Sequence, residues 1–70
     1  MEKPKNILIE EQYGSAYTLQ GNKLVYMPLN QDGKILYEQK GFVDFYSLDE
    51  VTVYKLKQIK NKLLKRAKTI

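Results

Sequence analysis

The residues best suited to chemistry are seven cations that fall within fourteen positions, 55 to 68, with no acidic residue among them. Ammonium and guanidinium groups bind phosphate oxygens, and a protein that neutralises several phosphates gains affinity by releasing counterions from the nucleic acid. Six of the seven are lysine, which suits contact with a phosphate backbone better than the bidentate recognition of a base. The candidate nucleic-acid-binding residues are Lys55, Lys57, Lys62, Lys65, Arg66 and Lys68.

Catalytic and metal-binding chemistry find little support in the sequence. Histidine and cysteine are absent, which removes thiolate and imidazole ligands and the general base most used near neutral pH. Glu10 and Glu11 are adjacent on an expected strand and therefore point to opposite faces. Asp32, Glu38 and Asp44 do not have the spacing of an oxygen-ligand loop. We therefore expect a non-enzymatic protein without a metal or cofactor.

The charges are divided unevenly along the chain. Residues 1–50 hold five lysines and eight acids, a net charge of −3, whereas residues 51–70 hold six lysines and one arginine, a net charge of +7. Such asymmetry points to nucleic acid, an anionic membrane or an acidic partner. No apolar run approaches the roughly 18 residues of a membrane span, and the first five residues, MEKPK, do not resemble a signal peptide. We expect a cytoplasmic protein.

Glycine-containing turns divide residues 7–46 into expected antiparallel strands. Gly21-Asn22 tolerates the positive φ of a two-residue hairpin turn. Asp32-Gly33 is the stronger hairpin signal, and its return strand is expected over Ile35 to Lys40. The remaining expected elements are a short strand over Ile7 to Glu11 and, over Phe42 to Tyr46, either a last strand or an extended lead into a helix.

The registers set by these two turns place three tyrosines on one face of the sheet. Tyr17 is expected opposite Tyr26, and Pro28 opposite Tyr37. The other face is also apolar and carries Ala16, Thr18, Val25 and Met27. One face must pack on the helix, so the second needs the first strand, a second subunit or a ligand to cover it. The three tyrosines are therefore either core residues or an exposed face on which bases or a partner's side chains stack.

One amphipathic helix is expected over residues 47–69. Ser47 and Glu50 fit a capping box, and no helix-breaking residue occurs between positions 48 and 68. At 100° per residue most of the cations lie opposite an apolar stripe that meets the sheet. The residues of that stripe are Val53, Leu56, Ile59, Leu63, Leu64, Ala67 and Ile70.

The order of these elements predicts a single α+β domain. A three- or four-stranded antiparallel sheet, a meander of hairpins, is packed by one long C-terminal helix, and residues 1–6 form a flexible start. In outline this order resembles the three-stranded-sheet-plus-helix domains of some integrases and plant transcription factors, and small archaeal chromatin proteins. The resemblance covers residues 16–68 and implies nucleic-acid binding, which integrase-type domains achieve with the sheet while the helix braces it.

Four interpretations of the basic helix remain open. The helix is either a solvated face that only keeps the domain soluble, a phosphate-binding surface, a site for an acidic protein, or a membrane-surface helix. The membrane-surface interpretation is disfavoured because the apolar stripe lacks Trp and Phe. We expect non-specific contact with the backbone of DNA or RNA. The alternative is a protein-interaction or regulatory module that is homodimeric through a spare apolar sheet face. The Lys-, Tyr- and Asn-rich composition would also suit a phage or mobile-element protein that targets a host factor.

Overall fold

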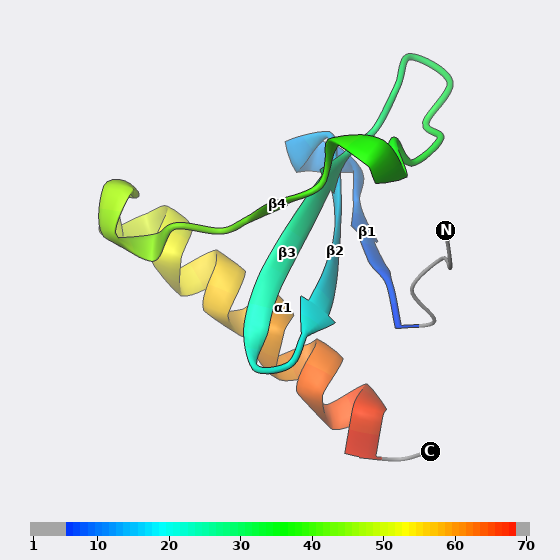
Figure 1. The fold of residues 1–70 in the computed structure, drawn as a ribbon. Coiled ribbons are helices and arrows are strands. Elements are labelled where there is room, and N and C mark those ends of the chain that lie inside the picture. Colours follow the sequence, from blue (N-terminus) through cyan, green and yellow to red (C-terminus); the bar gives the residue numbers. More distant parts are fainter. Residues whose placement is uncertain (1–5, 69–70) are drawn as a thin grey trace.

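Four antiparallel strands and one helix make up the fold, which the computed structural model describes over residues 6–68, with only the backbone at residue 68 (Figure 1). The strand order follows the chain order, so every connection is local. The expected α+β class is confirmed, with four strands. The elements are β1 (Leu8–Glu10), β2 (Ser15–Gln20), β3 (Lys23–Pro28), β4 (Gly41–Phe42) and α1 (Glu50–Lys68), with the 3₁₀ turns η1 (Glu11–Tyr13), η2 (Tyr37–Gln39) and η3 (Phe45–Ser47).

The β2–β3 hairpin has the register that the Gly21-Asn22 turn predicts. Tyr17 pairs with Tyr26, and Leu19 pairs with Leu24. Gly21 has a φ of +64°, a conformation that glycine adopts without the steric cost of a Cβ atom. The first strand is shorter than predicted, and it adds to the free edge of β2 in antiparallel orientation. This central hairpin is the platform on which the helix packs.

The loop after β3 is wider than the predicted two-residue turn. The side-chain oxygen of Asn30 accepts hydrogen bonds from the backbone N–H groups of Asp32 and Lys34, both at 2.9 Å. The backbone N–H of Asn30 donates to the Lys34 carbonyl at 2.8 Å. An asparagine side chain that captures nearby backbone donors offers the chain an alternative to a strand ladder. The chain therefore leaves β3 in a closed loop instead of a tight hairpin.

The return strand predicted over Ile35 to Lys40 is wrong. After a single bridge between Leu29 and Ile35, the chain forms η2, and only then does β4 pair with β3. This register places Gly41 opposite Tyr26. A Cβ atom at Gly41 would lie 2.8 Å from the Tyr26 hydroxyl oxygen. The missing side chain thus lets the Tyr26 ring lie across β4.

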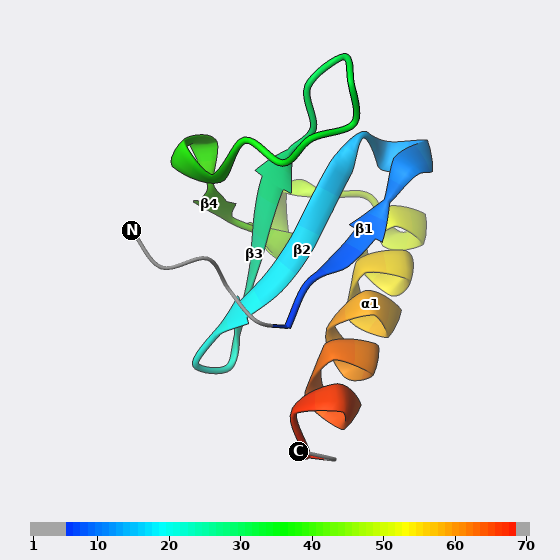
Figure 2. The ribbon, with the colours of Figure 1, turned by 90° about the vertical axis from the view of Figure 1, so that its right-hand side faces the viewer.

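The helix packs on the sheet face that carries Tyr17 and Leu24. These residues form the buried core with Leu56, Ile59 and Leu63 of α1, and the helix runs obliquely along that side of the sheet (Figure 2). Burying one leucine or isoleucine side chain contributes about 2 kcal/mol, so the three helix residues together contribute about 6 kcal/mol. Of the remaining predicted stripe, Val53 and Leu64 are half-buried, Ala67 is exposed, and Ile70 lies outside the described residues.

The opposite face of the sheet is also buried, at Ala16, Thr18, Val25 and Met27. The Thr18 hydroxyl donates to the Asn6 carbonyl at 2.7 Å, and the Asn6 amide donates to the Leu63 carbonyl at 2.8 Å. Asn6 therefore connects β2 to α1, and the remainder of the start expected to be flexible, residues 1–5, lies outside the described residues. Because both faces carry buried side chains, the spare apolar face expected to support a homodimer is not present at the centre of the sheet.

The helix begins at residue 50, and Asp49 caps it in place of the predicted Ser47. The Asp49 carboxylate accepts hydrogen bonds from the backbone N–H and the hydroxyl of Thr52. Ser47 lies in η3 and donates its hydroxyl to the Asp44 carbonyl at 3.0 Å. Leu48 is extended and packs against the core, so the chain cannot enter the helix before it. Aspartate is as good a cap as serine, and packing decides between them.

Replacing Asp49 with asparagine is expected to remove a pH-dependent part of the stability. The hydrogen bonds from Thr52 hold the pKa of the Asp49 carboxyl below its ordinary value of 3.8. A lowered folded-state pKa gives stability that is present above that ordinary value and lost as the pH falls through the folded pKa. Asparagine keeps the acceptor but neither titrates nor carries the charge that favours a helix N-terminus.

Thermal melts followed by circular dichroism would measure this effect. The wild type should melt above Asp49→Asn at pH 7, and the gap should shrink as the pH falls below 3.8. Asp49→Ala, which lacks any cap, should melt lowest at pH 7. A gap between the wild type and Asp49→Asn that stays constant down to pH about 2 would contradict the role of the Asp49 charge.

Candidate nucleic-acid interface

The charged residues of α1 lie on its outer side because its inner side packs in the core. Leu56, Ile59 and Leu63 face the sheet, and successive residues of an α-helix are rotated by about 100°. The cations outside that arc are exposed, and we call them the cationic surface: Lys55, Lys57, Lys62, Lys65 and Arg66. The side chain of Lys68, the sixth predicted residue, lies outside the described residues. The helix therefore presents five of the six predicted cations to solvent.

Two members of the cationic surface contact the N-terminal strand region. The Arg66 guanidinium donates to the Ile7 carbonyl at 3.2 Å, and the Lys55 ammonium lies 5.9 Å from the centre of the Tyr13 ring. A cation over an exposed ring is stabilised by about 0.5–1 kcal/mol. These contacts hold both cations beside β1 and η1. Arg66 thus has a structural contact in addition to its charge.

The other three lysines remain available for a ligand. Within the described part of the chain, no hydrogen-bond or ion-pair partner contacts Lys57, Lys62 or Lys65, and no acid occurs between positions 51 and 68. Asp49 and Glu50 occupy the start of α1, where negative charge is favoured by the helix dipole. The positive charge along the rest of α1 is therefore not neutralised locally. No helix among residues 6–68 combines the length and the apolar character needed to cross a bilayer.

The predicted aromatic face is not an exposed platform. Tyr17 is only 6% exposed and belongs to the core beneath α1. Burial raises the pKa of its hydroxyl above the ordinary value of 10.0, and the hydrogen bond with the Ser15 side chain offsets this only in part. Tyr26 is 39% exposed, whereas Tyr37 lies in η2 because the predicted return strand does not form. The structure therefore pairs Tyr17 with Tyr26 across β2 and β3 and places Tyr37 outside the strands.

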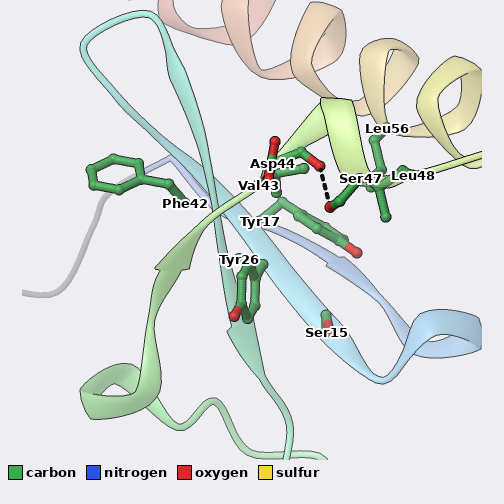
Figure 3. Close-up of a pocket in the computed structure, with 9 residues that line it drawn as sticks. All are labelled: Ser15, Tyr17, Tyr26, Phe42, Val43, Asp44, Ser47, Leu48 and Leu56. Carbon is green, nitrogen blue, oxygen red and sulfur yellow. Dashed lines mark hydrogen bonds between the residues drawn. The ribbon is translucent and has the colours of Figure 1, made fainter.

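A shallow groove of about 350 Å³ lies beside Tyr26, between the sheet and the start of α1 (Figure 3). Tyr17, Leu48 and Leu56 form much of its apolar wall. The ring of Phe42 points away from the groove, and the Lys23 ammonium lies 5.4 Å from its centre. Four of its nine lining residues, Tyr17, Val43, Leu48 and Leu56, belong to the core or pack against it.

The polar groups of the groove are engaged in local turns. The Asp44 carboxylate accepts the Tyr46 N–H at 3.1 Å, and the hydroxyls of Ser15 and Ser47 donate to backbone carbonyls. Both hydroxyls are therefore directed to main-chain oxygens and not to a carboxylate. Among residues 6–68 no cluster of three acidic, histidine or cysteine side chains is placed to hold a metal ion.

Comparison with known proteins found no match to a family model, a curated protein or a solved structure. The outline resemblance to sheet-and-helix nucleic-acid-binding domains therefore gains no support from these comparisons. Function has to be argued from the residues of this chain and their placement.

Proposed function

We propose that the protein binds nucleic acid through its phosphate backbone and that the cationic surface of α1 makes the contact, without catalysis. The observation that supports this best is the exposure of Lys57, Lys62 and Lys65 on one helix, with no neutralising partner among the described residues. Their long, flexible side chains suit phosphates at varied positions. A cytoplasmic location, where nucleic acid is accessible, fits this function.

The charge distribution also orients the molecule toward a polyanion. Residues 1–50, which include the sheet and its loops, carry a net charge of −3, and residues 51–70 carry +7. A phosphate backbone is attracted to α1 and repelled by the sheet, so approach from the helix side is favoured. Each phosphate neutralised adds about 0.9 to the slope of log K against log salt for duplex DNA. Four or five contacts on α1 would give a slope of roughly −4.

Reversing two unpartnered cations should weaken binding while the fold is retained. Lys62→Glu/Lys65→Glu is expected to bind labelled DNA or RNA at least about tenfold more weakly at low salt and to show a smaller salt slope. Both lysines are exposed, so the melting temperature should change little. The measurement is fluorescence anisotropy across several salt concentrations.

The matched control is Lys34→Glu/Lys40→Glu, which makes the same charge change at exposed positions away from α1. This control should retain most of the affinity. An equal loss in the control would show that net charge alone drives binding. Wild-type binding that is insensitive to salt, or weaker than about millimolar at low salt, would contradict phosphate contact.

A protein contact is the second candidate function, and the apolar side chains around the start of α1 favour it. Tyr46 is fully exposed and Val51 is more than half exposed. Exposed apolar side chains that gather near a groove are typical of interaction surfaces. The partner, a second copy of the chain or another protein, would contact this end of the domain instead of a sheet face.

Sedimentation over a range of concentrations tests the self-association form of this second function. If two copies meet at the start of α1, the wild type should sediment as a dimer at high concentration, and Tyr46→Ser/Val51→Ser should sediment as a monomer. Phe42 and the groove remain intact in that variant, so its fold can be verified by an unchanged melting curve. A wild type that is monomeric at every concentration would exclude the homodimer.

A further inference from the structure

A row of polar side chains runs along the centre of the outer side of α1. With about 100° between successive residues, four side chains fall within an arc of roughly 60°, opposite the buried stripe; they are Tyr54, Gln58, Asn61 and Lys65. All four are exposed. Within residues 6–68 no hydrogen bond engages the side-chain amides of Gln58 and Asn61. The two amides are thus free to bind a ligand at the middle of the helix.

Lysines lie on both sides of this row. By the same rotation, Lys57 is about 70° to one side, and Lys62 and Lys55 are about 70° and 90° to the other. The outer side of α1 therefore has hydrogen-bonding amides at its centre and positive charge along both margins. Lys65, at the C-terminal end of the row, adds one cation in line with the two amides.

We propose that α1 lies in the major groove of B-form duplex DNA. In this arrangement Gln58 and Asn61 face the base edges, Lys57 contacts the phosphates of one strand, and Lys62 contacts those of the other. The proposal rests on the phosphate-binding function above and names its ligand. The three-part layout of the helix matches a groove whose floor carries bases and whose two walls carry phosphates.

The dimensions of helix and groove agree. An α-helix with its side chains is about 10–12 Å across, and the major groove of B-form DNA is about 12 Å wide. The row from Tyr54 to Lys65 extends about 16 Å along the axis, which corresponds to about five base pairs. The major groove of A-form RNA is too narrow for side chains to read. DNA duplex is therefore the favoured ligand.

The chemistry of the amides specifies which base they would read. A carboxamide carries both a donor and an acceptor, and adenine presents an N6 donor beside an N7 acceptor in the major groove. Gln58 and Asn61 are therefore expected to favour A·T pairs over G·C pairs. The lysines add affinity that is independent of sequence.

The remainder of the domain leaves this approach open. The sheet lies on one side of α1 only, and the last turns of the helix extend past the β2–β3 turn in both views (Figures 1 and 2). Glu50 is the one acid on the helix, and it lies about 6 Å along the axis from Tyr54. Its charge repels phosphate, so the DNA contact is centred on residues 54–65.

Four 16-base-pair probes of equal charge test the proposal by fluorescence anisotropy at one salt concentration. They are a DNA duplex rich in A·T pairs, a DNA duplex of G·C pairs, the A·T-rich duplex with 7-deazaadenine in place of adenine, and the corresponding RNA duplex. The 7-deazaadenine probe removes the N7 acceptor from the major groove without altering the charge. We expect the A·T-rich DNA to bind about tenfold more tightly than each of the other three.

Three variants separate base contact from phosphate contact. Gln58→Ala/Asn61→Ala should bind all DNA probes at the level of the 7-deazaadenine duplex, with an unchanged salt slope because neither residue is charged. Lys62→Ala should keep the A·T preference and lose about 0.9 from the salt slope. The control Gln31→Ala/Gln39→Ala removes two exposed amides away from α1 and should behave as the wild type.

The outcomes distinguish this inference from the function on which it rests. Equal, salt-dependent binding of all four probes, unaffected by Gln58→Ala/Asn61→Ala, would overturn the groove assignment and leave phosphate binding in place. Tighter binding of the RNA duplex would also overturn it. Binding of none of the probes at low salt would overturn both.

Discussion

Leu56, Ile59 and Leu63 pack against the β2–β3 hairpin, and this packing holds the helix on the sheet. Its burial contributes about 6 kcal/mol before the opposing conformational entropy is subtracted. It also fixes the rotation of α1 about its own axis. Rotating the helix to bury a lysine would place an unpaired ammonium group in the core, at a cost of several kcal/mol. The charged side of α1 therefore faces solvent as a consequence of packing.

Contacts from the two ends of the described chain reinforce this rotation. Asn6 bridges the Thr18 hydroxyl and the Leu63 carbonyl, and Arg66 donates to the Ile7 carbonyl. The two contacts join the entry to β1 to the last turns of the helix. A chain of this size has a thin core, and polar ties of this kind keep the far end of the helix against the sheet.

Local sequence signals predicted the parts of the fold that local chemistry controls. The Gly21-Asn22 turn set the register of the first hairpin, and the apolar spacing of α1 identified its buried side. The second predicted hairpin was wrong because the Asn30 side chain accepts hydrogen bonds from the backbone of Asp32 and Lys34, which forms a wider loop. The predicted helix start was wrong because Leu48 packs against the core in an extended conformation. The helix therefore begins after Leu48, and Asp49 caps it instead of Ser47.

In the candidate site, too, the features set by local spacing were predictable and those set by tertiary contacts were not. Helical spacing was enough to predict which cations are exposed, because they lie opposite the buried apolar stripe of α1. The placement of Lys55 over Tyr13 and of Arg66 at Ile7 joins residues distant in sequence, and no local pattern indicates either contact. Tyr17 and Tyr26 pair as predicted, whereas Tyr37 does not join them on the sheet because the predicted return strand does not form. The central position of Gln58 and Asn61 follows from helical spacing once the buried stripe is known.

Backbone amide chemical shifts of the ¹⁵N-labelled protein, titrated with a 12-base-pair DNA duplex, would test most directly whether the outer side of α1 is the binding surface. The largest shift changes should fall between Lys55 and Arg66, with smaller changes at neighbouring η1 and little change in β3. Changes centred on Tyr26 and the groove at the start of α1 would contradict binding by the helix face, and so would a spectrum that does not change at low salt.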